Sequence, residues 1–165
     1  MHHDYENRVT ATGIIELNLM ETDLRKLIKR KKVKTMTQRF FRCNICGNII
    51  AMVEESGVPV ECCGQDMTEL VPGTTDGAKE KHVPVFEVKD NKVHVKVGSE
   101  EHPMTKEHYI QWISIRTDSG NQRKELKPGE SPKACFALCE GEELREVYAY
   151  CNIHGLWKAV ANQCC

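Results

Sequence analysis

The sequence predicts an all-β protein, in which a small metal-binding module precedes an immunoglobulin-like β-sandwich. Two observations predict it. From His82 to Cys151, short runs rich in β-branched residues alternate with turn-forming residues, as in a sandwich of many short strands. Before them, residues 38–72 hold four clustered cysteines in a segment whose own apolar core is slight. A block this small needs a cross-link or a metal ion to hold its fold.

Length and composition allow one domain, or one domain and a small module. The chain has 165 residues, 40% of them hydrophobic, which is enough for a packed core. Its mean hydropathy of -0.49 fits the absence of any stretch near the roughly 20 apolar residues of a membrane-spanning helix. The formal net charge of -1 gives no global field that favours nucleic acid or an anionic surface.

The nine cysteines favour metal binding over disulfide bonds. Their odd number argues against a pure disulfide framework. The N-terminus lacks the charged, apolar and small-residue regions of a secretory signal, so we expect a cytoplasmic protein. Clustered thiols in the reducing cytoplasm are more often metal ligands than disulfides.

Residues 1–35 are interpreted as an N-terminal extension. Apolar residues at helical spacing and the basic run Lys29–Lys32 suit one short amphipathic helix. Two interpretations stay open: a contact with nucleic acid or a membrane surface, or a solvated extension. We hypothesise that the native protein starts at Met36, because the compact sequence begins just after it.

The module at residues 36–72 carries a four-thiolate site. A knuckle spans Cys43–Gly47, where the glycine lets backbone amides turn toward the sulfurs. The segment Cys62-Cys63-Gly64 supplies the other two thiolates. Short strands are expected at 49–53 and 58–60. Four thiolates suit tetrahedral iron or zinc, and the spacing does not say which. The adjacent Cys62-Cys63 pair differs from a zinc ribbon, which would show a second Cys-x-x-Cys.

A linker at 72–76 joins the two modules, and the second module, residues 73–165, continues as a β-sandwich. The strands are predicted from β-branched and apolar runs, with Asp90-Asn91 as a hairpin turn and further turns at 118–121 and 127–130. The expected strands are Val83–Val85, Val93–Val97, Ile110–Ile115, Ala134–Leu138 and Glu146–Cys151.

Five residues of the second module form a candidate metal site. Cys151 and His154 are three residues apart in a tight loop, where Gly155 permits the turn. Three upstream histidines, His82, His102 and His108, can supply the other ligands. Four imidazoles are too many for a tetrahedral structural zinc, whereas a redox-active iron with one open position suits them.

The other histidines are set aside as ligands. His94 shares a strand face with Lys92 and Lys96, a face that we expect to be exposed to solvent. His2 and His3 belong to the extension. We interpret Cys135 and Cys139 as free thiols and assign no function to Cys164-Cys165.

Motifs along residues 36–161 resemble desulfoferrodoxin, the two-iron form of superoxide reductase. They are the two cysteine clusters, Glu80-Lys81-His82-Val83-Pro84, His102-Pro103-Met104, His108-Tyr109-Ile110 and Cys151-Asn152-Ile153-His154-Gly155. The resemblance implies a rubredoxin-like (desulforedoxin-like) iron on the first cluster and a second iron on the histidines and the last cysteine. It implies ligation by Nδ1 of His154 and by Nε2 of the other histidines. The implied ligands are Cys43, Cys46, Cys62 and Cys63 in the first site, and His82, His102, His108, His154 and Cys151 in the second.

The resemblance also implies an activity: one-electron reduction of superoxide to hydrogen peroxide, in oxidative-stress defence. Lys81 is expected to steer the superoxide anion, and Glu80 to bind the oxidised iron. The family implies a homodimer and an electron donor such as rubredoxin. Two alternatives remain: a non-catalytic electron-transfer protein that uses the four-cysteine iron, and a zinc-binding interaction or DNA-binding module with Lys29–Lys32 as its basic contact.

Overall fold

The computed structural model describes residues 37–161, which lie in one compact unit that begins at Thr37. The interpretations made for residues 1–35, for Met36 and for Cys164-Cys165 lie outside the described residues. Within the described part, no helix is long and apolar enough to cross a membrane.

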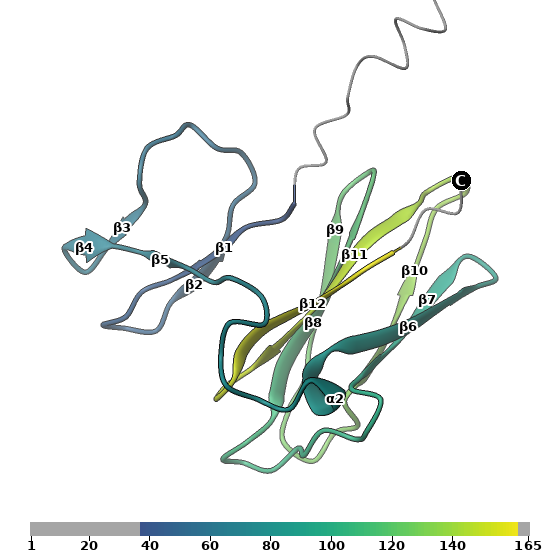
Figure 1. Ribbon diagram of the computed structural model, residues 1–165. Coiled ribbons are helices and arrows are strands. Elements are labelled where there is room, and N and C mark those ends of the chain that lie inside the picture. The colour runs from purple at the N-terminus through teal and green to yellow at the C-terminus, as the bar shows by residue number, and fades with distance from the viewer. Residues whose placement is uncertain (1–36, 162–165) are drawn as a thin grey trace, which may run out of the picture. The chain divides into compact units, whose positions relative to one another are not determined.

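The small module consists of five short strands (Figure 1). A three-stranded antiparallel sheet has the order β2-β1-β5, and a separate hairpin pairs β3 with β4. The strand expected at 58–60 is wrong, because Pro59 cannot donate a ladder hydrogen bond and Val58 is 71% exposed. The strands are β1 Phe40–Arg42, β2 Ile49–Ala51, β3 Glu61–Cys62, β4 Gln65–Asp66 and β5 Thr68–Glu69.

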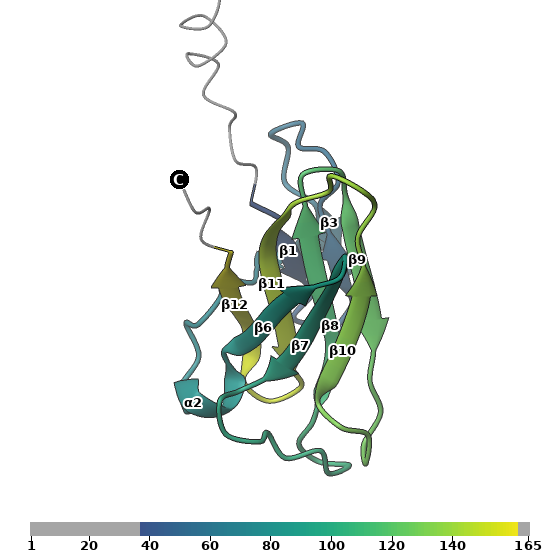
Figure 2. The same cartoon turned by 90° about the vertical axis from the view of Figure 1, so that its right-hand side faces the viewer.

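The second module is a sandwich of two antiparallel sheets, which confirms the predicted fold class. Figure 2 shows the sheet β10-β7-β6 in front of the sheet β12-β11-β8-β9. The strands are β6 Pro84–Lys89, β7 Lys92–Val97, β8 Ile110–Thr117, β9 Asn121–Glu125, β10 Lys133–Ala137, β11 Leu144–Cys151 and β12 Gly155–Val160; one helical turn, α2, spans Lys79–His82.

The β6–β7 hairpin has the turn that its sequence predicts. Asp90 and Asn91 have φ angles of 50° and 55°, the left-handed conformation that a two-residue type I′ turn requires. The turn fixes the register, so that Val93, Val95 and Val97 point into the core and the residues between them point outward.

The two central strands, β8 and β11, are buried on both faces. One face meets the other sheet through an aliphatic cluster that includes Ile113, Ile115 and Val147. The opposite face carries Trp112 and Tyr148, which pack against Phe40 of β1. The small module therefore covers a sheet face that would otherwise expose aromatic rings.

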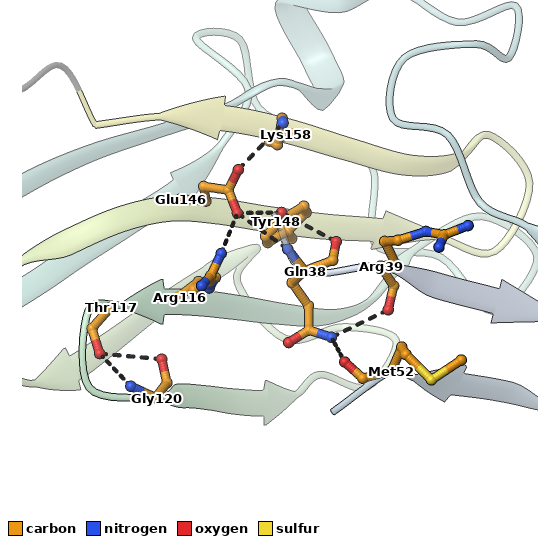
Figure 3. Close-up of polar contacts among 9 residues, drawn as sticks. All are labelled: Gln38, Arg39, Met52, Arg116, Thr117, Gly120, Glu146, Tyr148 and Lys158. Atoms are coloured by element: carbon orange, nitrogen blue, oxygen red, sulfur yellow. Dashed lines mark hydrogen bonds and ion pairs between the residues drawn. The ribbon is translucent and has the colours of Figure 1, made fainter. Parts of the chain in front are cut away.

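A buried carboxylate reinforces this contact between the modules (Figure 3). Glu146 is 7% exposed and accepts a 2.6 Å hydrogen bond from the Tyr148 hydroxyl. Its carboxylate also accepts a hydrogen bond from the backbone N–H of Gln38, and it pairs with Arg116 and Lys158. Because two cations and two donors surround it, the buried charge is compensated.

Candidate metal centres

The four cysteines of the small module converge on one point. The sulfurs of Cys43, Cys46, Cys62 and Cys63 all lie within 4.8 Å of one another. Two neighbouring pairs, Cys46–Cys62 and Cys62–Cys63, are 3.7 and 3.9 Å apart. Four sulfurs about 2.3 Å from a tetrahedral metal lie about 3.8 Å from each other, so the group fits such an ion.

The adjacent cysteines occupy a tight turn. Cys63 and Gly64 link β3 to β4 with φ angles of 54° and 77°, a two-residue turn with both residues left-handed. Cys62 ends one strand while Cys63 lies in the turn, and both sulfurs reach the same site. The knuckle on the other side closes through a 3.0 Å hydrogen bond from the Gly47 N–H to the Cys43 carbonyl.

The thiols of this cluster differ in acidity. Backbone N–H groups of Cys46 and Ile45 lower the pKa of the Cys43 thiol to about 6, despite its complete burial. Hydrogen bonding with Cys46 raises the pKa of Cys63 to about 12. One thiolate is therefore favoured in the protein alone, and a metal cation has to displace the remaining protons.

The five predicted ligands of the sandwich also converge. One ligand atom from each of His82, His102, His108, Cys151 and His154 lies within 4.8 Å of the other four. Neighbouring imidazole rings around the group are 4.6–4.8 Å apart, and the rings of His82 and His108, which face each other across it, are 6.1 Å apart. The four rings therefore surround a central point.

Backbone carbonyls set which nitrogen of two rings faces that point. The Nδ1–H of His82 donates to the Ala78 carbonyl at 2.7 Å, and that of His102 donates to the Pro103 carbonyl at 2.5 Å. Both rings then present the lone pair of Nε2 inward. His154 faces inward with Nδ1, which is 2.9 Å from His82 Nε2 and 3.6 Å from the Cys151 sulfur.

The unpaired nitrogens indicate that a cation belongs here. The Nε2 atoms of His102 and His108 are buried and have no hydrogen-bond partner among the described residues. Leaving a buried polar atom unpaired costs about 1–3 kcal/mol, which a bound metal offsets. Burial also lowers the pKa of His82, of His108 and of His102, the last to about 4, so all three rings are neutral near pH 7. Neutral imidazoles with one thiolate suit iron.

The thiolate ligand approaches from the protein interior. Cys151 is fully buried in the aliphatic cluster at the end of β11. There the pairing with β8 is irregular: Tyr150 pairs with Trp112 but Cys151 pairs with Ile110, which leaves Gln111 as an extra residue. Such bulges redirect side chains beside functional sites. Burial raises the Cys151 pKa, and the N–H groups of His154 and Ile153 oppose that rise.

Asn152 connects the Cys151 loop to the His108 loop, a role that the motif alone did not reveal. Its side-chain oxygen accepts a 2.9 Å hydrogen bond from the Tyr109 N–H, and its amide donates at 2.8 Å to the Glu107 carbonyl. Its backbone N–H donates to the Tyr109 carbonyl at 3.2 Å. Asn152 therefore holds the residues on both sides of His108.

The segment interpreted as a linker also contacts the site. The Thr75 hydroxyl and the Trp157 indole N–H both donate to the His154 carbonyl, the latter at 3.0 Å. A side chain at Gly77 would lie 3.1 Å from Trp157, whose ring stacks on His82 at 4.9 Å. Sequence reasoning missed these supports, because the segment offers only the small and polar residues of an ordinary loop.

Glu80 and Lys81 lie in α2, directly before the ligand His82, and both are exposed. The Glu80 carboxylate does not belong to the ligand group. The backbone of this turn is held firmly: the Glu80 carbonyl accepts hydrogen bonds from the Ser99 hydroxyl at 3.2 Å and the Glu100 N–H at 3.0 Å. A Cβ at Gly98 would lie 2.3 Å from the Glu100 carbonyl oxygen, so only glycine fits there.

The remaining cysteines and His94 stay outside both groups. Cys135 is half-buried and Cys139 is exposed, and both are free thiols. His94 is exposed on the same face of β7 as Lys92 and Lys96, as predicted.

Known proteins show the same two-part organisation. Family models described as Desulfoferrodoxin and as its N-terminal domain match residues 74–160 and 35–70. A desulfoferrodoxin homolog of Archaeoglobus fulgidus is 47% identical over 125 residues, covering 76% of this chain and 98% of that protein. The desulfoferrodoxin of Nitratidesulfovibrio vulgaris is 44% identical over 121 residues, covering 73% and 94%. The crystal structure of the superoxide reductase from Treponema pallidum is 41% identical, with a TM-score of 0.64, and covers 74% of this chain and 98% of that one.

Proposed function

Because the chain belongs to the desulfoferrodoxin family, we propose that it is a superoxide reductase that converts superoxide to hydrogen peroxide in oxidative-stress defence. The observation that carries this function is the convergence of four imidazoles and one thiolate on a single point. The four-cysteine group is the second iron site of the family.

His82, His102, His108, His154 and Cys151 would hold an iron ion, which would supply the one electron that superoxide accepts. Burial keeps the imidazoles of His82, His102 and His108 neutral, so the thiolate is the charged ligand of the set. A divalent ion is then not neutralised, and the site attracts an anion. Backbone N–H groups at Ile153 and His154 stabilise the thiolate.

Two exposed residues act at the open side of the site. Lys81 adds a positive charge beside His82 and His108, and this charge steers superoxide toward the iron. Glu80 precedes Lys81 on the same turn, and its carboxylate would bind a ferric ion at this site, since a carboxylate suits a hard ferric ion. Glu80→Ala is expected to change the pH-dependent spectrum of the ferric site and to spare superoxide reduction. An unchanged spectrum removes Glu80 from this role.

The wider assignment completes the proposal. The four-cysteine module spans residues 36–72 and the superoxide reductase domain residues 73–165, after an N-terminal extension. The protein works in the cytoplasm as a homodimer and receives its electron from rubredoxin or a similar small iron–sulfur protein. The compartment is supported by the seven cysteines among the described residues, which form no disulfide bond: five belong to the two metal sites, and Cys135 and Cys139 are free thiols, which match a reducing environment.

Superoxide consumption by the pre-reduced protein tests the function. The wild type is expected to consume superoxide without releasing dioxygen, and Cys151→Ser to lose this activity while retaining the absorption of the four-cysteine iron. A wild type that accepts and donates electrons but does not consume superoxide would instead be an electron carrier of rubredoxin type. A colourless protein with bound zinc would exclude both.

A further inference from the structure

The outer face of the sheet β10-β7-β6 carries an unusual charge pattern. Every second residue of these strands points away from the core, because the alternate ones are buried in it. The outward residues form three cross-strand rows: Lys89 with Lys92 and Ala137, Glu87 with His94 and Cys135, and Val85 with Lys96 and Lys133. We call these nine outward positions the lysine face, after its four lysines, Lys89, Lys92, Lys96 and Lys133.

Two of these rows place like charges directly opposite each other. Lys89 pairs with Lys92 across β6 and β7, and Lys96 pairs with Lys133 across β7 and β10. Directly opposed residues have Cβ atoms about 4.5–5.5 Å apart, and like charges at that spacing destabilise a sheet. Stability alone therefore does not explain the arrangement.

Counter-charges on the chain do not neutralise the face. Glu87 is the one acidic residue on it, so the four lysines leave a local net charge of 4 − 1 = +3, against -1 for the whole chain. No ion pair involves the lysine face within residues 37–161. The Lys96 ammonium donates to the Ser99 carbonyl, which leaves its charge unpaired.

The lysine face lies close to the five-ligand site along the chain. Strand β6 begins two residues after the ligand His82. At the same end of the sheet, Lys96 holds Ser99, whose hydroxyl bonds the Glu80 carbonyl. Val85, near this end of β6, is 50% exposed. It lines a surface hollow of about 470 Å³ together with Glu87, His94 and Cys135. An apolar contact therefore lies next to the charges, three residues from an iron ligand.

We propose that the lysine face binds the acidic surface of the small iron–sulfur protein that reduces this enzyme, an inference that rests on the proposed function. Each turnover moves one electron from the donor's ferrous iron, which is oxidised, to the ferric centre of this protein, which is reduced; no atom or proton is exchanged. The short chain from Val85 to His82 connects the docked donor to the site.

The make-up of the face favours a protein over a nucleic acid. Its nine positions hold no arginine, phenylalanine, tyrosine or tryptophan, and the single ring is the imidazole of His94 beside the Glu87 carboxylate, so bases find no row of stacking rings and phosphates no bidentate donor. Lysines in the same row as an exposed valine instead match an acidic protein surface with an apolar contact beside it, and such charge complementarity acts mainly on the association rate.

The test compares a double variant of the face, Lys92→Gln with Lys133→Gln, with a matched control, Lys124→Gln with Lys127→Gln. The control lysines lie on β9 and the turn after it, outside the face. Rapid mixing measures how fast reduced rubredoxin with an acidic surface reduces each oxidised protein. The face variant is expected to react at least about ten-fold more slowly at low ionic strength, and its rate to depend less on salt.

Four further measurements separate the explanations: calorimetric affinity, the iron spectrum, the reaction with superoxide and the oligomeric state. Calorimetric affinity for oxidised rubredoxin is expected to fall only in the face variant, while the iron spectrum and the reaction of pre-reduced protein with superoxide stay unchanged. An unaltered rubredoxin rate, or an equal loss in the control, overturns the proposal. A changed oligomeric state in the face variant also overturns it, because the face would then bind a second copy. Failure to consume superoxide disproves the proposed function, while the affinity still reports on docking.

Discussion

Replacing Asn152 with alanine is expected to weaken metal binding at the five-ligand site without removing a ligand. The Asn152 side chain makes two hydrogen bonds, of 2.9 Å to the Tyr109 N–H and 2.8 Å to the Glu107 carbonyl, which flank His108. A net contribution of about 1 kcal/mol for each bond gives about 2 kcal/mol in total. If that energy holds His108 in its binding position, metal affinity falls about 30-fold, since about 1.4 kcal/mol corresponds to ten-fold. This agrees with the 10–100-fold that loss of an outer hydrogen bond commonly costs a metal site.

The measurement is a competition between the metal-free protein and a chromophoric chelator for cobalt, whose spectrum also reports the thiolate ligand. Gln122→Ala is the matched control, because it removes a 2.7 Å amide hydrogen bond to the Ala137 carbonyl, away from both ligand groups. Asn152→Asp keeps the shape but places a carboxylate oxygen against the Glu107 carbonyl, so its affinity is expected to fall as in Asn152→Ala. The reasoning is refuted if Asn152→Ala binds cobalt like the wild type, or if Gln122→Ala loses as much.

Three further changes test other parts of the structure. Lys81→Ile is expected to slow the bimolecular reaction with superoxide and flatten its salt dependence, as followed by pulse radiolysis; identical rates would exclude steering. Gly98→Ala is expected to destabilise the fold by more than about 2 kcal/mol in thermal unfolding, because a clash with backbone oxygens adds to a strained φ of 81°. Gly129→Ala is the control, because Gly129 has a φ of 85° but open space around it, so this variant shows the effect of backbone strain alone. Equal losses of stability in the two variants would exclude the clash. The hydrogen bond from the Thr117 hydroxyl lowers the pKa of Glu142 in the folded protein. The ionised Glu142 therefore stabilises the fold fully above the unfolded pKa of about 4.3, and this stabilisation is lost as the pH falls through the folded pKa. Glu142→Gln should make the free energy of unfolding depend less on pH in the acid range, and an unchanged dependence would contradict this.

The sequence predicted those features in which local chemistry and tertiary structure agree. The valines of β7 alternate with polar residues, and Asp90-Asn91 allows one tight turn, so the strand, its face and its register follow from the pattern. The cysteines and histidines were identified because ligand chemistry restricts their number and neighbours. The two iron sites and the fold class are accordingly confirmed.

The features that the sequence did not predict depend on tertiary contacts. Strand β9, Asn121–Glu125, consists of polar and charged residues and is a strand because it pairs with the edge of β8. Val58–Val60 has the composition of a strand, but Pro59 has no N–H to donate to a ladder, and Val58 is exposed and does not contribute to the core. The hydrogen bond from Thr75 to His154 joins residues 79 positions apart, and a polar residue in a short loop does not identify such a partner.

The aromatic layer between Phe40 and the rings of Trp112 and Tyr148 makes the two halves of the protein interdependent. A sandwich without the small module would expose the indole and phenol rings beside the Glu146 carboxylate to solvent, and an exposed apolar patch of this kind promotes self-association. Loss of metal from the cysteine knuckle would loosen the strand that shields those rings, so damage at one iron spreads to the stability of the other half. A version of the protein that keeps only the sandwich and its iron would need polar residues in place of these aromatic ones to be stable as a monomer.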